Sequence, residues 1–158
     1  MSTTTKLSED KDGKFVDPTI YRSMIGSLLY LIASRPDISY GVCARFQANP
    51  KESHLEAVKR IMCYISGTVS CGIFYTFDTN VEIAGYSDAD WGGNLKNRKS
   101  TSSGCFFVGN NLVAWHSKKQ NFISLSTAKA EYVAAGSCCT QMLWMKQMLM
   151  DYGFSQEY

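Results

Sequence analysis

The spacing of hydrophobic and polar residues changes near residue 68, and this change predicts a helical first part and a mainly β second part. Before residue 68, apolar residues recur three or four positions apart; after it, they alternate or run in short stretches of β-branched and aromatic residues. The first predicted helix begins at Pro18, where Asp17 can act as N-cap and proline fits the first helical position. A second helix is expected from Pro36 to about Gln47.

A third helix is predicted to end at Gly67. Its start signal combines Asn49, Pro50 and Glu52 in an arrangement similar to a capping box. Its buried stripe is expected to consist of Leu55, Val58, Met62 and Ile65. Residues 1–17, which are rich in Ser, Thr, Lys and Asp, are expected to form a flexible lead to this helical unit, which spans residues 18–68.

The second half of the chain is expected to form antiparallel strands and one long helix. The stretches CGIFYTF (71–77) and VEIAGYSD (81–88) are typical of strands, and SGCFFVGNNLVAWHS (103–117) is typical of two strands joined at a Gly-Asn-Asn turn. A helix from Ser126 to about Tyr152 follows, and Gly153 is placed to end it. Because this helix is apolar nearly all round, it is expected to pack on the sheet and on a further layer. The predicted fold class is α+β.

Charge is distributed unevenly, although the net charge is only +2. Between Trp91 and Met150 the sequence has seven basic residues and a single acid, Glu131. Such a basic segment can meet a polyanion such as a nucleic acid. A solvated lysine surface without a partner explains the same composition, so both interpretations stay open.

The six cysteines form no C-x-x-C pair, and neither of the two histidines lies at zinc-ligand spacing. We therefore expect free thiols in a reducing compartment rather than a zinc site or disulfides. The first 14 residues are too polar for a secretory signal. The longest apolar run, Met24 to Ala33, is too short to span a bilayer. These features predict an intracellular, soluble chain without a membrane partner.

Acidic residues suggest a site at the end of one predicted strand. Asp88 and Asp90 lie two residues apart, so their side chains share a face of that strand. Glu131 lies among alanines that allow its helix to approach a sheet closely, and a helix crossing the strand would bring Glu131 beside Asp88. Converging carboxylates are suitable ligands for Mg²⁺, which supports phosphodiester hydrolysis. A solvated turn is the alternative interpretation of the two aspartates.

Five longer motifs follow one another along the chain. They are YRSMIGSLLYLIASRPDISYGV, YSDADWGG, NRKSTSSG, WHSKKQ and STAKAEYVAA. Together they closely resemble the Pol polyprotein of copia-type LTR retrotransposons over nearly the whole chain, from about residue 1 to residue 153. The resemblance implies that residues 18–68 are the end of the reverse transcriptase, its thumb or connection region. It also implies that residues 71–158 are the N-terminal part of a ribonuclease H domain, a truncated α/β ribonuclease H-like fold.

Two acids match catalytic positions of that family. Asp88 matches the first catalytic aspartate and Glu131 the catalytic glutamate, and both would bind Mg²⁺, with Mn²⁺ as an alternative. Asp90 has no catalytic counterpart and is expected to lie exposed beside the site. The resemblance implies an endonuclease that hydrolyses the RNA strand of RNA–DNA hybrids.

Four further residues are candidates for nucleic-acid contact. Ser126 and Thr127 lie where members of the family touch the nucleic-acid backbone, although capping the helix is an equal role for Ser126. Lys118 and Lys119 follow the third strand of the family pattern and would approach phosphate, or else lie at a solvated strand end.

The chain departs from the family pattern in what it lacks. The third catalytic aspartate is expected on a strand beyond Tyr158, and the polymerase aspartates are expected upstream of residue 18. We therefore expect metal binding and hydrolysis to be weakened by orders of magnitude. A non-catalytic remnant that binds nucleic acid or a protein, or that has no selected role, is the alternative.

The resemblance also implies partners and a location. The implied partners are the RNA–DNA hybrid and the rest of the Pol polyprotein, in a cytoplasmic element particle or the nucleus. An open sheet edge would in addition allow self-association.

Overall fold

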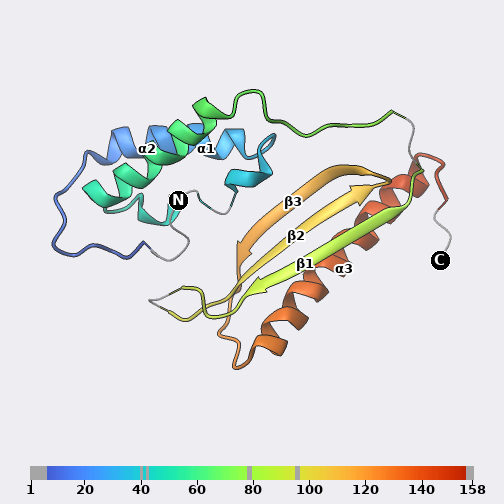
Figure 1. The fold of residues 1–158 in the computed structure, drawn as a ribbon. Coiled ribbons are helices and arrows are strands. Elements are labelled where there is room, and N and C mark those ends of the chain that lie inside the picture. Colours follow the sequence, from blue (N-terminus) through green and yellow to red (C-terminus); the bar gives the residue numbers. More distant parts are fainter. Residues whose placement is uncertain (1–6, 40, 42, 78–79, 95–96, 156–158) are drawn as a thin grey trace. The chain divides into compact units, whose positions relative to one another are not determined.

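The computed structural model describes residues 7–39, 41, 43–77, 80–94 and 97–155 (Figure 1). The chain divides into two compact units, Met1–Ile73 and Phe74–Tyr158. The first unit is built from helices, and the second from a three-stranded sheet and one long helix. The mixed α+β class predicted from the sequence is confirmed.

The first unit contains two α-helices, α1 (Pro18–Leu31) and α2 (Glu52–Gly67). The predicted start of α1 is confirmed: the Asp17 carboxylate accepts a hydrogen bond from the Thr19 N–H at 2.8 Å, and Pro18 occupies the first helical position. The predicted end of α2 at Gly67 is confirmed as well.

The single helix predicted from Pro36 to Gln47 is wrong. Two short 3₁₀ segments are present instead, η1 (Pro36–Ile38) and η2 (Ala44–Phe46), while Tyr40 and Val42 lie outside the described residues. Gly41 lies between the two segments, and glycine costs about 1 kcal/mol relative to alanine inside a helix. A stretch this short cannot recover that cost from its few helical hydrogen bonds.

The start of α2 is held by a histidine rather than by the predicted capping box at Asn49. The N-cap is Lys51, and its backbone N–H donates to His54 Nδ1 at 3.1 Å. His54 is fully buried, stacks on Phe46 and forms a second hydrogen bond, 2.7 Å long, between its Nε2 and the Ser8 carbonyl oxygen. The described part of the expected flexible lead is therefore hydrogen-bonded to α2.

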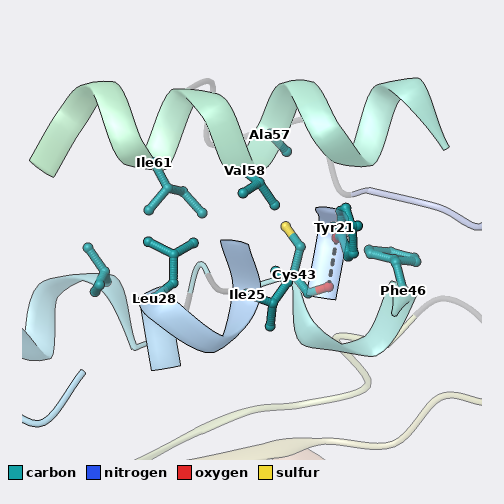
Figure 2. Packing of buried hydrophobic residues seen from close by; sticks show 9 residues of the cluster. Tyr21, Ile25, Leu28, Cys43, Phe46, Ala57, Val58 and Ile61 are labelled. Carbon is teal, nitrogen blue, oxygen red and sulfur yellow. Dashed lines mark hydrogen bonds between the residues drawn. The ribbon is translucent and has the colours of Figure 1, made fainter. Parts of the chain in front are cut away.

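Side chains from α1, α2 and the segment between them form the core of the first unit (Figure 2). Tyr21 of α1 is fully buried, and its hydroxyl donates to the Cys43 carbonyl at 2.9 Å. Of the predicted stripe on α2, Val58 is fully buried. The other three members pack at the border of this core while partly exposed; they are Leu55, Met62 and Ile65.

The second unit has an antiparallel sheet in the order β1-β2-β3 (Figure 1). Its strands are β1 (Ile83–Asp90), β2 (Thr101–Val108) and β3 (Asn111–Lys119). The predicted hairpin between β2 and β3 is confirmed, with Gly109 at a φ of 56° in its turn.

The strand predicted at residues 71–77 is wrong, because this segment has no strand partner among the described residues. The Asn111 side chain instead accepts from the Thr76 N–H at 2.8 Å and donates to the Thr76 carbonyl at 3.0 Å. One amide side chain thus binds the backbone groups that a neighbouring strand would otherwise use.

The long helix α3 (Thr127–Asp151) covers one face of the sheet (Figure 1). Phe106 of β2 packs there against Cys138 and Met145. Gly85 of β1 permits this close packing, because a Cβ at that position would lie 2.5 Å from the sulfur of Met142. The helix exposes large apolar side chains elsewhere, namely Tyr132, Leu143 and Trp144.

Within the described ranges, no helix combines the length and apolarity needed to cross a membrane.

Candidate active site

The structure brings Glu131 to the strand that carries Asp88. Glu131 lies in the second turn of α3, and its Oε1 accepts a hydrogen bond from the backbone N–H of Ala89 at 3.2 Å. Ala89 directly follows Asp88 in β1. The glutamate singled out in the sequence therefore reaches the neighbour of the first candidate aspartate, from 42 residues away in the chain.

The two carboxylates approach β1 from different sides. Side chains alternate along a strand, so Asp88 lies on the face opposite to Gly85, which is the position that contacts α3. Glu131 comes from the α3 side. Asp88 and Glu131 are both exposed, so water and a hydrated ion can reach them.

Asp90 is half-buried, and the prediction that it lies exposed is wrong. Its carboxylate folds back over Gly93 and occupies the place where a Cβ of that residue would stand. The Gly93 N–H also donates to the Asp90 carbonyl, at 3.4 Å. Asp90 therefore contacts the turn after β1, which explains why a glycine is needed at position 93.

Lys118 and Lys119 are the last two residues of β3, whereas the sequence predicted that they follow that strand. Strand register pairs Ala89 with Ser102 and Ser102 with Lys118, and in the same way Asp90 is linked through Thr101 to Lys119. Two strand spacings separate each lysine from β1, which is about 10 Å. Both exposed lysines thus lie at the same end of the sheet as Asp88.

Ser126 and Thr127 open α3 at the same end of the unit. Ser126 is the N-cap, and its hydroxyl oxygen accepts from the Lys129 N–H at 3.2 Å. This confirms the capping alternative for Ser126. Thr127 is the first helical residue and is exposed. Contact of either residue with nucleic acid stays a prediction.

Residues that the sequence interpretation did not select hold the connection between β3 and α3. The Trp91 indole Nε1 donates to the Ser124 carbonyl in that connection at 2.9 Å. Within the separate connection between β1 and β2, the Gly92 N–H donates to the Ser100 hydroxyl at 3.2 Å. Gln120, the last residue of the WHSKKQ motif, is buried among polar partners. A glutamine that follows two exposed lysines gives no signal of burial in the sequence.

His116 lies on the α3 side of the sheet and stacks on Phe106, with ring centroids 5.8 Å apart. Burial, with a contribution from the positive charge of Lys118, lowers the pKa of His116 below its ordinary value of 6.5. The ring is therefore neutral at pH 7, and its stacking on Phe106 makes it a packing group of the sheet.

Metal ligands are few at this site. Across the described residues, no group of three or more His, Cys, Asp or Glu side chains is close enough to hold a metal ion. Asp88 and Glu131 consequently offer at most a pair of carboxylates. Such a pair is sufficient only for an ion that keeps several of its own waters.

Comparison with known proteins identifies long relatives. The chain is 39% identical over 155 residues to the retrovirus-related Pol polyprotein from transposon RE1 of Arabidopsis thaliana, an alignment of 97% of the chain and 11% of the polyprotein. It is 40% identical over 141 residues to the retrovirus-related Pol polyprotein from transposon TNT 1-94 of Nicotiana tabacum, which covers 87% of the chain and 10% of that polyprotein. No family model and no solved structure matches the chain.

A shorter relative matches over most of its own length. The secreted RxLR effector protein 161 of Plasmopara viticola is 35% identical over 128 residues, which are 79% of the chain and 90% of that protein.

The chain belongs to the family of retrovirus-related Pol polyproteins from copia-type retrotransposons, which confirms the resemblance carried by the five motifs. It spans about a tenth of the length of the Pol polyproteins that it matches.

Proposed function

We propose that residues 74–158 are part of a ribonuclease H-like domain in which Asp88 and Glu131 bind Mg²⁺ for hydrolysis of the RNA strand of an RNA–DNA hybrid. One observation carries the proposal: Glu131 Oε1 lies 3.2 Å from the backbone nitrogen of the residue that follows Asp88. Membership of the Pol family supports it. In the same proposal the first unit is the end of a reverse transcriptase, and the rest of a Pol polyprotein is its partner.

The donor set fits magnesium better than a softer metal. Carboxylate oxygens are hard ligands, and Mg²⁺ is commonly held by one or two carboxylates together with waters and substrate phosphates. Asp88 and Glu131 are exposed, which leaves room for both waters and a phosphate. When bound, Mg²⁺ would supply an activated water and stabilise the leaving oxygen of the phosphodiester, and Mn²⁺ would replace it with the same ligands.

The residues around the carboxylates would bind and orient the hybrid. Lys118 and Lys119 place two positive charges at the same end of the sheet, where they would attract phosphate. Ser126 and Thr127 lie at the N-terminus of α3, where the partial positive charge of the helix favours a backbone phosphate. Nucleic-acid binding would therefore weaken steeply as the salt concentration rises.

Hydrolysis by this set alone is expected to be slow. The ribonuclease H pattern uses a third aspartate, and among the described residues no third acid lies close enough to share a metal ion with Asp88 and Glu131, since the Asp90 carboxylate folds back over Gly93. Asp151 cannot serve, because it lies 20 residues beyond Glu131 on the same helix, a distance of about 30 Å. A third carboxylate would therefore come from another segment of Pol or from another molecule.

The test uses a labelled RNA–DNA hybrid incubated with the purified chain and Mg²⁺ or Mn²⁺. Asp88→Asn and Glu131→Gln are expected to abolish cleavage of the RNA strand. Asp151→Asn, which changes an acid at the far end of the same helix, is the matched control and is expected to retain it. Cleavage that survives Asp88→Asn and Glu131→Gln would contradict the assignment of the site.

A folded wild-type chain that leaves the hybrid intact would instead favour the non-catalytic alternative. Binding of the same hybrid would then be measured at salt concentrations from about 50 to about 200 mM. Binding that weakens as salt rises would indicate a nucleic-acid-binding remnant, and absence of binding would indicate a chain without this partner. Loss of binding in Lys118→Gln and Lys119→Gln is expected in the first case.

A further inference from the structure

Gln120 is a polar side chain held in the interior of the second unit, with only 6% of its surface exposed. Its Nε2 donates to the Ser102 hydroxyl and to the Ala130 carbonyl, at 3.0 Å each. Its Oε1 accepts from the Ser124 hydroxyl at 2.9 Å. Both donors and one acceptor position of the amide are thus used, as expected of a buried glutamine.

These partners come from three separate parts of the unit. Ser102 belongs to β2, Ser124 to the connection between β3 and α3, and Ala130 to α3. Ala130 is itself fully buried and directly precedes Glu131. Gln120 therefore fixes the helix backbone at the residue next to the candidate metal ligand.

The contacts of Gln120 form a closed circuit with the candidate site. Ser102, which Gln120 binds, is the strand partner of Ala89. Ala89 in turn donates its N–H to Glu131, and Glu131 follows Ala130, which Gln120 also binds. Each link in this circuit restrains the others, so the distance from α3 to β1 at Glu131 depends on the Gln120 amide.

We infer that Gln120 is a positioning residue that holds the Glu131 carboxylate against β1 and so sets the Mg²⁺ affinity of the Asp88 and Glu131 pair. This inference rests on the proposed function. The physical reason is that a carboxylate on a helix gains affinity for a metal when its orientation is fixed in advance. Removal of groups that orient metal ligands typically lowers metal affinity by about 10–100-fold.

The test compares Gln120→Met with Gln147→Met in the full chain. Methionine is unbranched and of similar length, so it fills the same space without the amide. Gln147 is exposed near the other end of α3, where its Nε2 donates to Asp151. The same substitution there serves as the matched control.

Three readouts are needed, and the first does not depend on activity. Hydrogen exchange of the Ala89 amide reports directly on its hydrogen bond to Glu131, with the Phe106 amide as an internal reference for the core of the sheet. Titration with Mg²⁺, followed by the NMR signals of Asp88 and Glu131, gives the metal affinity. Cleavage of the RNA–DNA hybrid gives kcat and KM separately.

We expect Gln120→Met to speed exchange at Ala89 more than at Phe106, to weaken Mg²⁺ binding by about 10–100-fold, and to lower kcat with little change in KM. Gln147→Met is expected to change none of these. Equal acceleration at Ala89 and Phe106 would overturn the inference, because it would show a general structural role. Unchanged Mg²⁺ affinity in folded Gln120→Met would overturn it as well, while leaving the proposed function intact.

Failure of the proposed function has a different signature. If the wild-type chain shows no Mg²⁺-dependent shift at Asp88 or Glu131, the metal site itself is refuted, and the inferred effect of Gln120 on metal affinity falls with it. If Gln120→Met does not fold, Ser102→Ala provides the second test, because it removes one acceptor of the Gln120 amide and leaves the other two contacts. We expect Ser102→Ala to shift Ala89 exchange and Mg²⁺ affinity in the same direction by a smaller factor, and no change in either would overturn the inference.

Discussion

Replacing Arg35 by Met removes a cation that connects the segment after α1 to Thr68, the residue that follows α2. The Arg35 guanidinium donates to both Asp37 carboxylate oxygens, with Nε–Oδ1 at 3.0 Å and Nη2–Oδ2 at 2.8 Å. It also donates to the Thr68 carbonyl at 3.2 Å and to the Thr68 hydroxyl at 2.8 Å, just beyond the end of α2. We expect Arg35→Met to destabilise the first unit and to change how its stability depends on pH.

The size of the expected destabilisation follows from the pKa of Asp37. The hydrogen bond from Arg35 is the main cause that lowers the pKa of Asp37 from 3.8 to about 2. A pKa shift of this size corresponds to a contribution of at most about 2.4 kcal/mol to the free energy of unfolding. Because 35% of the Asp37 side chain is exposed, solvent screening reduces the contribution to about 1 kcal/mol.

The sign of the pH dependence follows from the direction of the shift. The pKa of Asp37 is lower in the folded than in the unfolded chain, so the interaction stabilises the fold at any pH above about 4. This stabilisation is lost as the pH falls from about 4 to about 2. In Arg35→Met the pKa of Asp37 should return toward 3.8, and this part of the pH dependence should disappear.

The assay is an NMR titration of the Asp37 carboxyl carbon, combined with urea unfolding at pH 7 and pH 2 followed at Val58 in the same unit. Arg60→Met is the matched control, because Arg60 forms only an exposed pair with Glu56 at 3.9 Å. The control should change stability by less than about 0.5 kcal/mol. An Asp37 that titrates near 3.8 in the wild type, or that does not respond to Arg35→Met, would refute the reasoning.

Further predictions concern packing and capping, each tested by thermal or urea unfolding. Gly136→Ala should stabilise α3 by about 0.5–1 kcal/mol, because a Cβ there meets nothing within 4 Å and alanine restricts the unfolded chain; a lower midpoint would contradict this. Gly104→Ala should destabilise the second unit by about 1–3 kcal/mol, because the new Cβ would lie 2.6 Å from Cε1 of His116, which is stacked on Phe106; wild-type stability would show that the ring moves freely. Ser126→Ala should cost about 1 kcal/mol through the lost N-cap, and Ser126→Asp should recover most of it; equal stability of both variants would argue against capping. Tyr21→Phe should cost about 1–3 kcal/mol, because the buried Cys43 carbonyl loses its donor; a neutral result would mean that water replaces the hydroxyl.

Elements with strong local signals were predicted correctly from the sequence. Asp17 and Pro18 define the start of α1 within two residues, and Gly109 sets the hairpin through its positive φ. The helix expected after Pro36 failed for a non-local reason as well as for the local cost of Gly41. The carbonyl of Cys43, at the start of η2, accepts from Tyr21 on α1, a partner that no local pattern indicates.

The strand expected at residues 71–77 failed in a related way. Its apolar and β-branched residues favour an extended backbone, but a strand also needs a partner, and Thr76 binds the Asn111 side chain instead. Strand propensity describes the fit of a residue to a sheet surface and does not specify pairing.

The candidate site was predicted only in part for a similar reason. Glu131 attracts attention because it is the single acid in a long basic and apolar segment, and Asp88 because it ends an apolar strand. Gln120 acquires its importance from burial and from partners on three elements. These properties exist only after the chain has folded, so a composition or spacing argument cannot detect them.

The hydrogen bond between Glu131 and Ala89 also affects whether a strand from another molecule can add to the edge of the sheet. β1 is one of the two outer strands of the described sheet, and outer strands offer unpaired N–H groups on which strands of other molecules can assemble. Glu131 engages one such group and places a negative charge there. An incoming strand would have to displace that carboxylate and leave it near its own carbonyl oxygens. The acid proposed to hold a metal is therefore also expected to disfavour strand addition at this point of the edge.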